Sequence, residues 1–102
     1  ADPEELILVK YFRNSFLATK VAFFNEIYDL CKKTKADYNT VARLIGMDPR
    51  IGTSHTTITE ERGFGGHCFP KDVSAILKMA EDLENNLNIL EAANNYNKRI
   101  RK

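Results

Sequence analysis

The sequence predicts an all-α domain of about four helices, and three observations support this prediction. No proline or glycine interrupts the chain between Pro3 and Gly46. Apolar residues in most of the remaining chain recur every three or four positions, which is the helical period, and no stretch of useful length alternates as a strand would. Residues 53–66 are rich in Thr, Gly and charge without a period, so we expect a long functional loop before the third helix.

The composition is typical of a folded domain. The 102 residues are 43% hydrophobic and 28% charged, which suffices for one modest core. The net charge is +1 with mixed signs, so the sequence predicts neither a nucleic-acid nor a membrane partner. Because no apolar run approaches the ~20 residues of a membrane span and no signal-peptide pattern opens the chain, we expect a soluble, cytoplasmic protein.

The first predicted helix covers residues 3–33. Asp2 can act as its N-cap and Pro3 suits the first helical position. Glu4 and Glu5 then lie near the positive end of the helix dipole. A helix of about thirty residues is ~45 Å long, whereas a compact chain of about 100 residues has a radius of gyration of only ~13 Å. We therefore expect this helix to extend beyond the rest of its own domain.

Apolar side chains cover most of the circumference of that helix. One broad face contains Leu6, Val9, Phe12, Phe16, Leu17, Phe23, Phe24, Ile27, Leu30 and Cys31, and Ile7, Val21 and Tyr28 extend it. The arc left for solvated residues is narrow and contains Glu4, Ser15, Thr19, Glu26 and Lys33. Because a helix packed on one side is polar over about half its circumference, the pattern predicts burial on two sides and hence a partner.

Three shorter helices follow in the prediction. Residues 38–46 form the second, with Asp37 as N-cap and Gly46 as its stop. Residues 47–52, "MDPRIG", form a tight turn. The third helix starts at Pro70 and continues to about residue 83, and the fourth covers residues 87–102. The predicted inward residues are, in chain order, Val41, Leu44, Ile45, Val73, Ile76, Leu77, Ala80, Leu87, Leu90, Ala93 and Tyr96.

The stretch "GFGGHCFPKD", residues 63–72, contains a candidate nucleophile. Cys68 lies just ahead of a predicted helix, where free N–H groups and the helix dipole favour a thiolate. Gly65 and Gly66 allow the backbone to approach a ligand closely. Asp72, one turn into the helix, can position a water or accept a proton, and Lys71 adds positive charge.

Two alternative interpretations of this region remain open at this point. The motif can be an ordinary helix start with Cys68 as a small buried residue. A zinc site can be drawn from Cys31, Cys68, His55 and His67, although no CxxC or HxxxH spacing supports it. The glycines do not have the GxGxxG spacing of a dinucleotide fingerprint. No metal ligand and no cofactor-binding residue is therefore predicted in this chain.

Lys10 and Asn14 form a second candidate pair on the first helix. They are one turn apart and so share a face. A cation and a hydrogen-bond donor can together stabilise an oxyanion. The alternative is that the Lys10 stem covers apolar surface and that Asn14 only caps a loop.

Taken together, "KYFRNSFLATKVAFFNEI", "DPRIG" and "GFGGHCFPKD" resemble the central domain of the UDP-glucose dehydrogenase family, the NAD-dependent nucleotide-sugar 6-dehydrogenases. The resemblance covers essentially the whole chain. It implies that Cys68 is the nucleophile that holds the oxidised sugar. It also implies that Lys10 and Asn14 steady the oxyanion and the attacking water, and that Asp72 assists water activation.

The same resemblance implies further roles. Arg50 of "DPRIG" matches an arginine that reaches the sugar in the neighbouring subunit. The substrate-binding positions implied are Phe64, Gly65, Gly66 and Phe69. The long first helix matches the core of a homodimer, which agrees with the burial on two sides predicted from periodicity.

The resemblance finally implies a domain organisation and a substrate. Residues 1–102 would be a single central domain, and the NAD-binding N-terminal and UDP-binding C-terminal domains of the family are absent from this sequence. The fragment alone is therefore expected to be inactive. UDP-glucose is the expected substrate and NAD the expected cofactor. The alternatives are GDP-mannose, a UDP-N-acetylhexosamine, or a non-catalytic dimerisation module.

Overall fold

The long N-terminal helix that the sequence predicts is present in the computed structural model, which describes residues 2–102. This helix, α1, spans Pro3–Lys32. Asp2 caps it by accepting a hydrogen bond from the N–H of Glu5, and the Glu5 side chain accepts one from the N–H of Asp2. Such a reciprocal capping box satisfies two N–H groups that the helix leaves free. The predicted start of α1 is confirmed.

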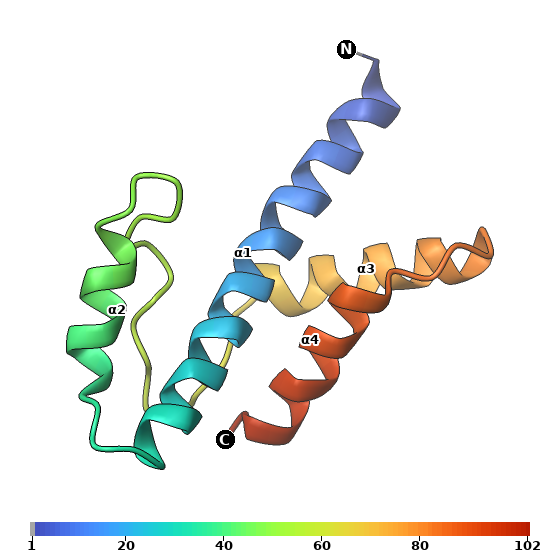
Figure 1. Ribbon diagram of the computed structural model, residues 1–102. Coiled ribbons are helices and arrows are strands. Elements are labelled where there is room, and N and C mark those ends of the chain that lie inside the picture. Colours follow the sequence, from blue (N-terminus) through green and yellow to red (C-terminus); the bar gives the residue numbers. More distant parts are fainter. Residues whose placement is uncertain (1) are drawn as a thin grey trace.

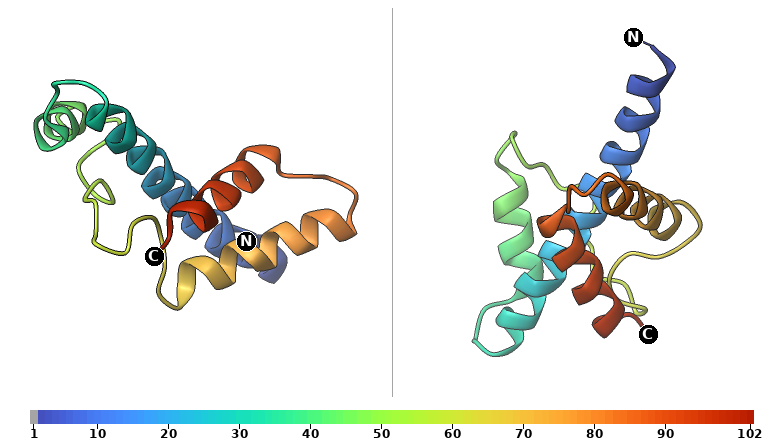
Figure 2. Two further views of the ribbon diagram at one scale, coloured as in Figure 1. Left: turned by 90° about the horizontal axis from the view of Figure 1, so that it is seen from below. Right: turned by 90° about the vertical axis from the view of Figure 1, so that its right-hand side faces the viewer.

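Three shorter helices surround α1, and the predicted all-α fold is confirmed. They are α2 (Tyr38–Gly46), α3 (Cys68–Asp82) and α4 (Asn88–Ile100), and residues 2–102 contain no strand. In Figure 1, α2 lies on one side of α1, and α3 and α4 lie on the other. The first turns of α1 project beyond all three helices, as the right-hand view of Figure 2 also shows. The radius of gyration, 14.9 Å, exceeds the ~13 Å of a compact chain of this length.

The core consists of two clusters that meet along α1. The larger joins α1, α3 and α4, and the smaller joins α1, α2 and the loop of residues 53–66. The buried members of the larger cluster are Ala18, Ala22, Phe64, Val73, Ile76 and Leu90. Those of the smaller are Phe24, Tyr38 and Ala42. The inner face predicted for α4 is confirmed, because Leu90 is buried and Leu87, Ala93 and Tyr96 pack against the core.

The side of α1 that faces its own domain carries mostly small residues. Ser15, Ala18 and Ala22 are each at most 3% exposed. The prediction that Ser15 is solvated was therefore wrong. Short side chains at a contact let two helices approach closely. The large apolar residues of α1 are instead mostly exposed: Leu6, Ile7, Val9, Phe12, Phe16, Phe23 and Leu30.

The inner face of α2 also differs from the prediction. Asp37 caps the helix as predicted, by accepting from the N–H of Thr40. Tyr38 and Ala42 are buried, whereas Leu44, predicted to face inward, is 56% exposed. Tyr38 sets which face of α2 points toward α1. Its ring packs edge-on against Tyr28 of α1, and its hydroxyl donates to the carbonyl of Thr56.

Helix α3 begins at Cys68, two residues before the predicted start at Pro70. Proline is tolerated within the first turn because the N–H groups there have no partner inside the helix. Its predicted inner face is confirmed at Val73, Ile76 and Ala80, which are buried. No helix in the described part of the chain is long and apolar enough to cross a membrane.

Candidate functional site

Asn14 and Asp72, two predicted site residues, meet across the α1–α3 interface. The side-chain amide of Asn14 donates a 2.6 Å hydrogen bond to Oδ2 of Asp72, across 58 positions of sequence. Asp72 is 0% exposed, and its Oδ1 has no hydrogen-bond partner among the described residues. The ammonium group of Lys71 lies 4.0 Å from that Oδ1. A buried carboxylate with one free oxygen is suited to bind a water or a proton.

Cys68 is the first residue of α3 and has a free, exposed thiol. Cys68 therefore lies inside the first helical turn, whereas the sequence analysis predicts it just ahead of the helix. The physical setting is the same, because N–H groups of the first turn lack helical partners and the dipole is positive there. Asp72 follows one turn later on the same helix, so the thiol and the carboxylate lie along one side of α3.

Lys10 lies one turn before Asn14 on α1 and is exposed. Its ammonium group is 5.9 Å from the ring centroid of Tyr11. No hydrogen bond or ion pair within residues 2–102 joins Lys10 to Cys68 or to Asp72. The structure thus joins Asn14 to Asp72 and leaves Lys10 in solvent.

Arg50 lies in a well-defined turn away from these contacts. Asp48 organises that turn, because its carbonyl accepts from the N–H groups of Ile51 and Gly52. Its carboxylate binds the Arg50 guanidinium through Nε at 3.0 Å and Nη2 at 2.7 Å. These hydrogen bonds lower the pKa of Asp48. The Arg50 side chain is 87% exposed.

The predicted substrate loop is shaped largely by contacts within the chain. Phe64 is buried in the core, and the Phe69 ring stacks on His55 with centroids 5.8 Å apart. Gly65 lies directly under the guanidinium of Arg101, where a Cβ would overlap it. Gly66 is exposed with a φ of 83°, which favours glycine.

Two buried asparagines that the sequence analysis missed hold this loop. Asn97 of α4 binds both backbone groups of Phe64, and Asn25 of α1 accepts from the N–H of Gly63. A signal was available in the sequence, because each lies at helical spacing from a core alanine: Asn25 follows Ala22, and Asn97 follows Ala93. A polar residue on an inward face requires a partner.

Arg62 joins the loop to Asp29 of α1, and Asp29 also binds Tyr96 of α4. Its guanidinium binds Asp29 at 2.8 Å and Asn25 at 2.8 Å. The Tyr96 hydroxyl donates to the other oxygen of Asp29. Burial raises the pKa of Asp29, but the hydrogen bonds from Tyr96 and Arg62 and nearby positive charge outweigh burial, so the net pKa is lowered. Burial and the bond to Asp29 raise the pKa of Tyr96.

Known proteins resemble this chain along nearly its whole length. The model of the "UDP-glucose/GDP-mannose dehydrogenase family, central domain" matches residues 5–99. The chain belongs to this family. UDP-glucose 6-dehydrogenases of Rickettsia bellii and Rhizobium meliloti are 46% and 45% identical to it over 89% and 90% of its length. A UDP-glucose dehydrogenase structure from the hyperthermophilic archaeon Pyrobaculum islandicum covers 97% of the chain with a TM-score of 0.88 at 38% identity.

This member of the dehydrogenase family spans only about a fifth of the length of those relatives. The aligned region covers 20% and 21% of the two enzymes and 22% of the solved chain. All the predicted site residues lie within the matched residues 5–99.

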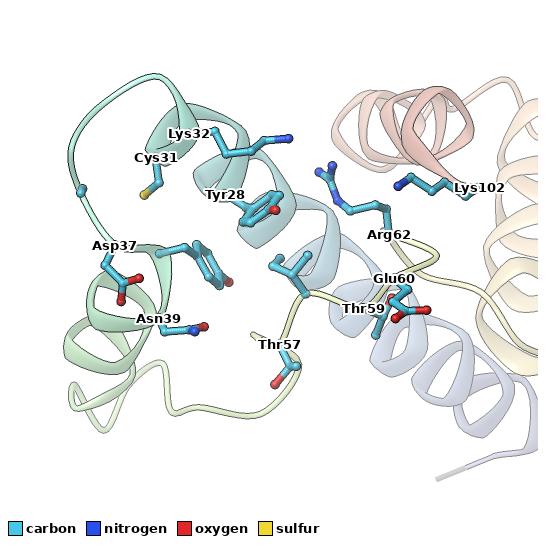
Figure 3. A pocket seen from close by; sticks show the side chains of 13 residues that line it. Tyr28, Cys31, Lys32, Asp37, Asn39, Thr57, Thr59, Glu60, Arg62 and Lys102 are labelled. Carbon is cyan, nitrogen blue, oxygen red and sulfur yellow. The ribbon is translucent and has the colours of Figure 1, made fainter.

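A separate groove in this family member contains none of the predicted site residues. It has a volume of about 500 Å³ and lies between the end of α1, α2 and the loop. Figure 3 shows Tyr28, Lys32 and Arg62 along it, with the thiol of Cys31 nearby. Burial and the neighbouring Cys31 raise the pKa of Tyr38, which also lines the groove, to about 12. Within residues 2–102, no three His, Cys, Asp or Glu side chains are grouped so that they could hold a metal.

Proposed function

We propose that the chain is the central, catalytic-cysteine domain of a longer NAD-dependent nucleotide-sugar 6-dehydrogenase that oxidises UDP-glucose to UDP-glucuronate. One observation carries this proposal most directly. The exposed thiol of Cys68 lies one helical turn before the buried Asp72, which Asn14 holds at 2.6 Å. A nucleophile beside an oriented carboxylate is the arrangement that covalent catalysis followed by hydrolysis needs.

In this proposal Cys68 holds the sugar between two oxidations. The C6 alcohol is first oxidised to an aldehyde, and the Cys68 thiolate adds to the aldehyde carbon to give a thiohemiacetal. Loss of a second hydride gives a thioester, and water hydrolyses that bond to release the carboxylate and the thiol. NAD, bound by another domain of the longer protein, would supply the hydride acceptor for both oxidations.

Asp72 and Asn14 serve the hydrolysis in this proposal. Asn14 occupies one oxygen of Asp72 and fixes the orientation of the carboxyl group. The other oxygen, which is buried and has no hydrogen-bond partner among the described residues, would hold the attacking water and receive its proton. Lys10, one turn before Asn14, would act on the oxyanion once substrate is present.

The residues of this chain do not fit an NAD site of their own. Residues 2–102 contain no strand, and "GFGG" lacks the glycine spacing of the dinucleotide fingerprint. We therefore assign NAD binding to an N-terminal domain of the longer protein, and nucleotide binding to a C-terminal one. The share of about a fifth of the relatives' length supports this assignment.

We further propose that two copies pair through the exposed apolar face of α1. Phe16 is 69% and Phe23 60% exposed in the single chain, and both line an apolar hollow. Arg50 lines the same hollow. A second copy seated there would therefore lie next to Arg50, which supports a contribution of Arg50 to the neighbouring subunit's site.

Substitution in the full-length protein tests the nucleophile. The Cys68→Ser variant should lose steady turnover of UDP-glucose to UDP-glucuronate, because a hydroxyl does not replace the thiolate as the nucleophile that the second oxidation needs. Cys31→Ser, which removes the other thiol, should keep normal turnover. Near-normal turnover of the Cys68 variant would contradict the assignment and favour a non-catalytic dimerisation role.

GDP-mannose is the second candidate substrate, because the matching family model covers dehydrogenases of both nucleotide sugars. Assays of the wild-type full-length protein with GDP-mannose, UDP-N-acetylglucosamine and UDP-glucose at equal concentration decide between them. A larger kcat/KM for either competitor would overturn the choice of UDP-glucose. The isolated 102-residue domain should produce no NADH with any of them.

A further inference from the structure

Two buried amide side chains hold the backbone of the loop that leads to Cys68. From α4, Asn97 accepts a 2.7 Å hydrogen bond from the N–H of Phe64 and donates a 3.0 Å bond to its carbonyl. From α1, Oδ1 of Asn25 accepts a 3.1 Å bond from the N–H of Gly63. Asn25 and Asn97 are 1% and 6% exposed. Solvent therefore has little access to replace either amide.

A single amide that binds both polar groups of one residue fixes that residue closely. The carboxamide of Asn97 carries a donor and an acceptor on one rigid plane, so it pairs with Phe64 as a neighbouring strand would. Rotation of the Phe64 backbone would break one of the two bonds. The Phe64 ring, 4% exposed, adds a third anchor in the core.

Gly63 makes room for this amide. Its φ is +63°, and a Cβ at this position would overlap Oδ1 of Asn97. The first glycine of "GFGG" is thus explained by the close approach of Asn97 rather than by a ligand. The next residues lead without interruption into the first turn of α3, where Cys68 lies.

We propose that Asn97 is a positioning residue for the dehydrogenase reaction. It acts through Phe64 and sets where Gly65, Gly66 and Cys68 lie relative to Asn14 on α1. Asn25 supports the same segment from the opposite helix. This inference rests on the proposed function, because the position of Cys68 matters only where Cys68 reacts.

The test uses the full-length enzyme with Asn97→Ala and Asn97→Asp. The aspartate variant keeps an acceptor for the N–H of Phe64 but loses the donor to its carbonyl, so it perturbs the loop even where the alanine variant fails to fold. Asn95→Ala is the matched control, because Asn95 is an exposed asparagine on the same helix. We measure kcat and KM for UDP-glucose well below each variant's Tm, and the rate at which iodoacetamide alkylates Cys68, followed by mass spectrometry of its peptide.

The Asn97 variants should lose about tenfold or more in kcat/KM, since small misplacements of reacting groups are costly. They should also alter the alkylation rate of Cys68, and Asn95→Ala should alter neither. If the Asn97 variants lower only the Tm and keep wild-type kcat, KM and alkylation, Asn97 is purely structural and the inference is wrong. If the wild type does not oxidise UDP-glucose, the proposed function fails, and the alkylation rates alone decide the role of Asn97.

Discussion

The side-chain amide of Asn14 is bound to the carboxylate of Asp72 at 2.6 Å, and this hydrogen bond ties the middle of α1 to the first turns of α3. Asp72 is fully buried, so no water outside the site replaces Asn14 as the partner of its Oδ2. The bond therefore contributes both to stability and to the geometry around Cys68.

Removal of this hydrogen bond should destabilise the domain. We expect Asn14→Ala to lower the free energy of unfolding by about 1.5–3 kcal/mol, which is typical for a hydrogen bond to a charged group. Urea denaturation of the 102-residue chain measures the change. Asn39→Ala, at an exposed position on α2, is the control and should stay close to the wild type. A loss no larger than that of the control would contradict the contribution of Asn14.

The exposed face of α1 should mediate self-association. We expect Phe16→Glu to shift the 102-residue chain from dimer to monomer, because a charge at a 69% exposed apolar position would be buried in the interface. Sedimentation velocity at micromolar concentration measures the oligomeric state. Leu83→Glu, at a 71% exposed position after α3, should leave the dimer intact. A wild-type chain that sediments as a monomer would rule out this interface.

The ion pair of Asp29 should make stability depend on pH in the acid range. The pKa of Asp29 is lower in the folded chain than its ordinary value of 3.8. Asp29 therefore stabilises the fold above that pH, and its contribution is lost as the pH falls through the folded-state pKa. The difference in unfolding free energy between wild type and Asp29→Asn should be constant from pH 8 to 6 and shrink below about pH 4.

Chemical denaturation at several pH values measures this difference. Glu60→Gln is the control, because Glu60 is exposed and lies in the same loop region as Arg62. A difference that instead grew as the pH fell would show that Asp29 is not stabilised in its ionised form.

Gly46 should not tolerate a larger residue. A Cβ at this position would overlap Cγ2 of Thr53 and lie 3.0 Å from the carbonyl oxygen of Gly52. We expect Gly46→Ala to lower the free energy of unfolding by about 1–3 kcal/mol, in the range of overpacked cores. Thermal unfolding of Gly46→Ala and of Gly46→Ala with Thr53→Ser tests this, because the second change removes the overlapping methyl group. Equal losses in both variants would exclude the contact with Thr53 as the cause.

Local rules predicted the helices well, because they depend on neighbours in sequence. The caps at Asp2 and Asp37 and the turn after Gly46 were all confirmed. The two burial predictions that were wrong concern side chains whose exposure depends on packing between segments far apart in sequence. Ser15 is buried because the helices packed on α1 approach closely, and Leu44 is exposed because Tyr38 turns α2 toward Tyr28.

The candidate site shows the same division. Cys68 and Asp72 could be paired from the sequence alone, because they are one turn apart on one helix. The contact between Asn14 and Asp72 spans 58 positions, and hydrophobic periodicity carries no information about such a pairing. Helical spacing could show that Asn25 and Asn97 face inward, but it could not show their partners in the loop, which lie 38 and 33 positions away. The roles of Lys10 and Arg50 stay predictions, since neither is bound to the other site residues within one chain.

The order in which the chain folds has a consequence for the reactive cysteine. The contacts that hold its loop join residues 33 to 38 positions apart, and the bond of Tyr96 to Asp29 spans 67. Such contacts form only after distant segments have met, at a cost in chain entropy. Helix α4, the last of the four helices in chain order, must dock before residues 62–64 are fixed. A nascent or partly unfolded chain would therefore present a mobile thiol, and the completed fold would be the first state in which Cys68 is placed for chemistry.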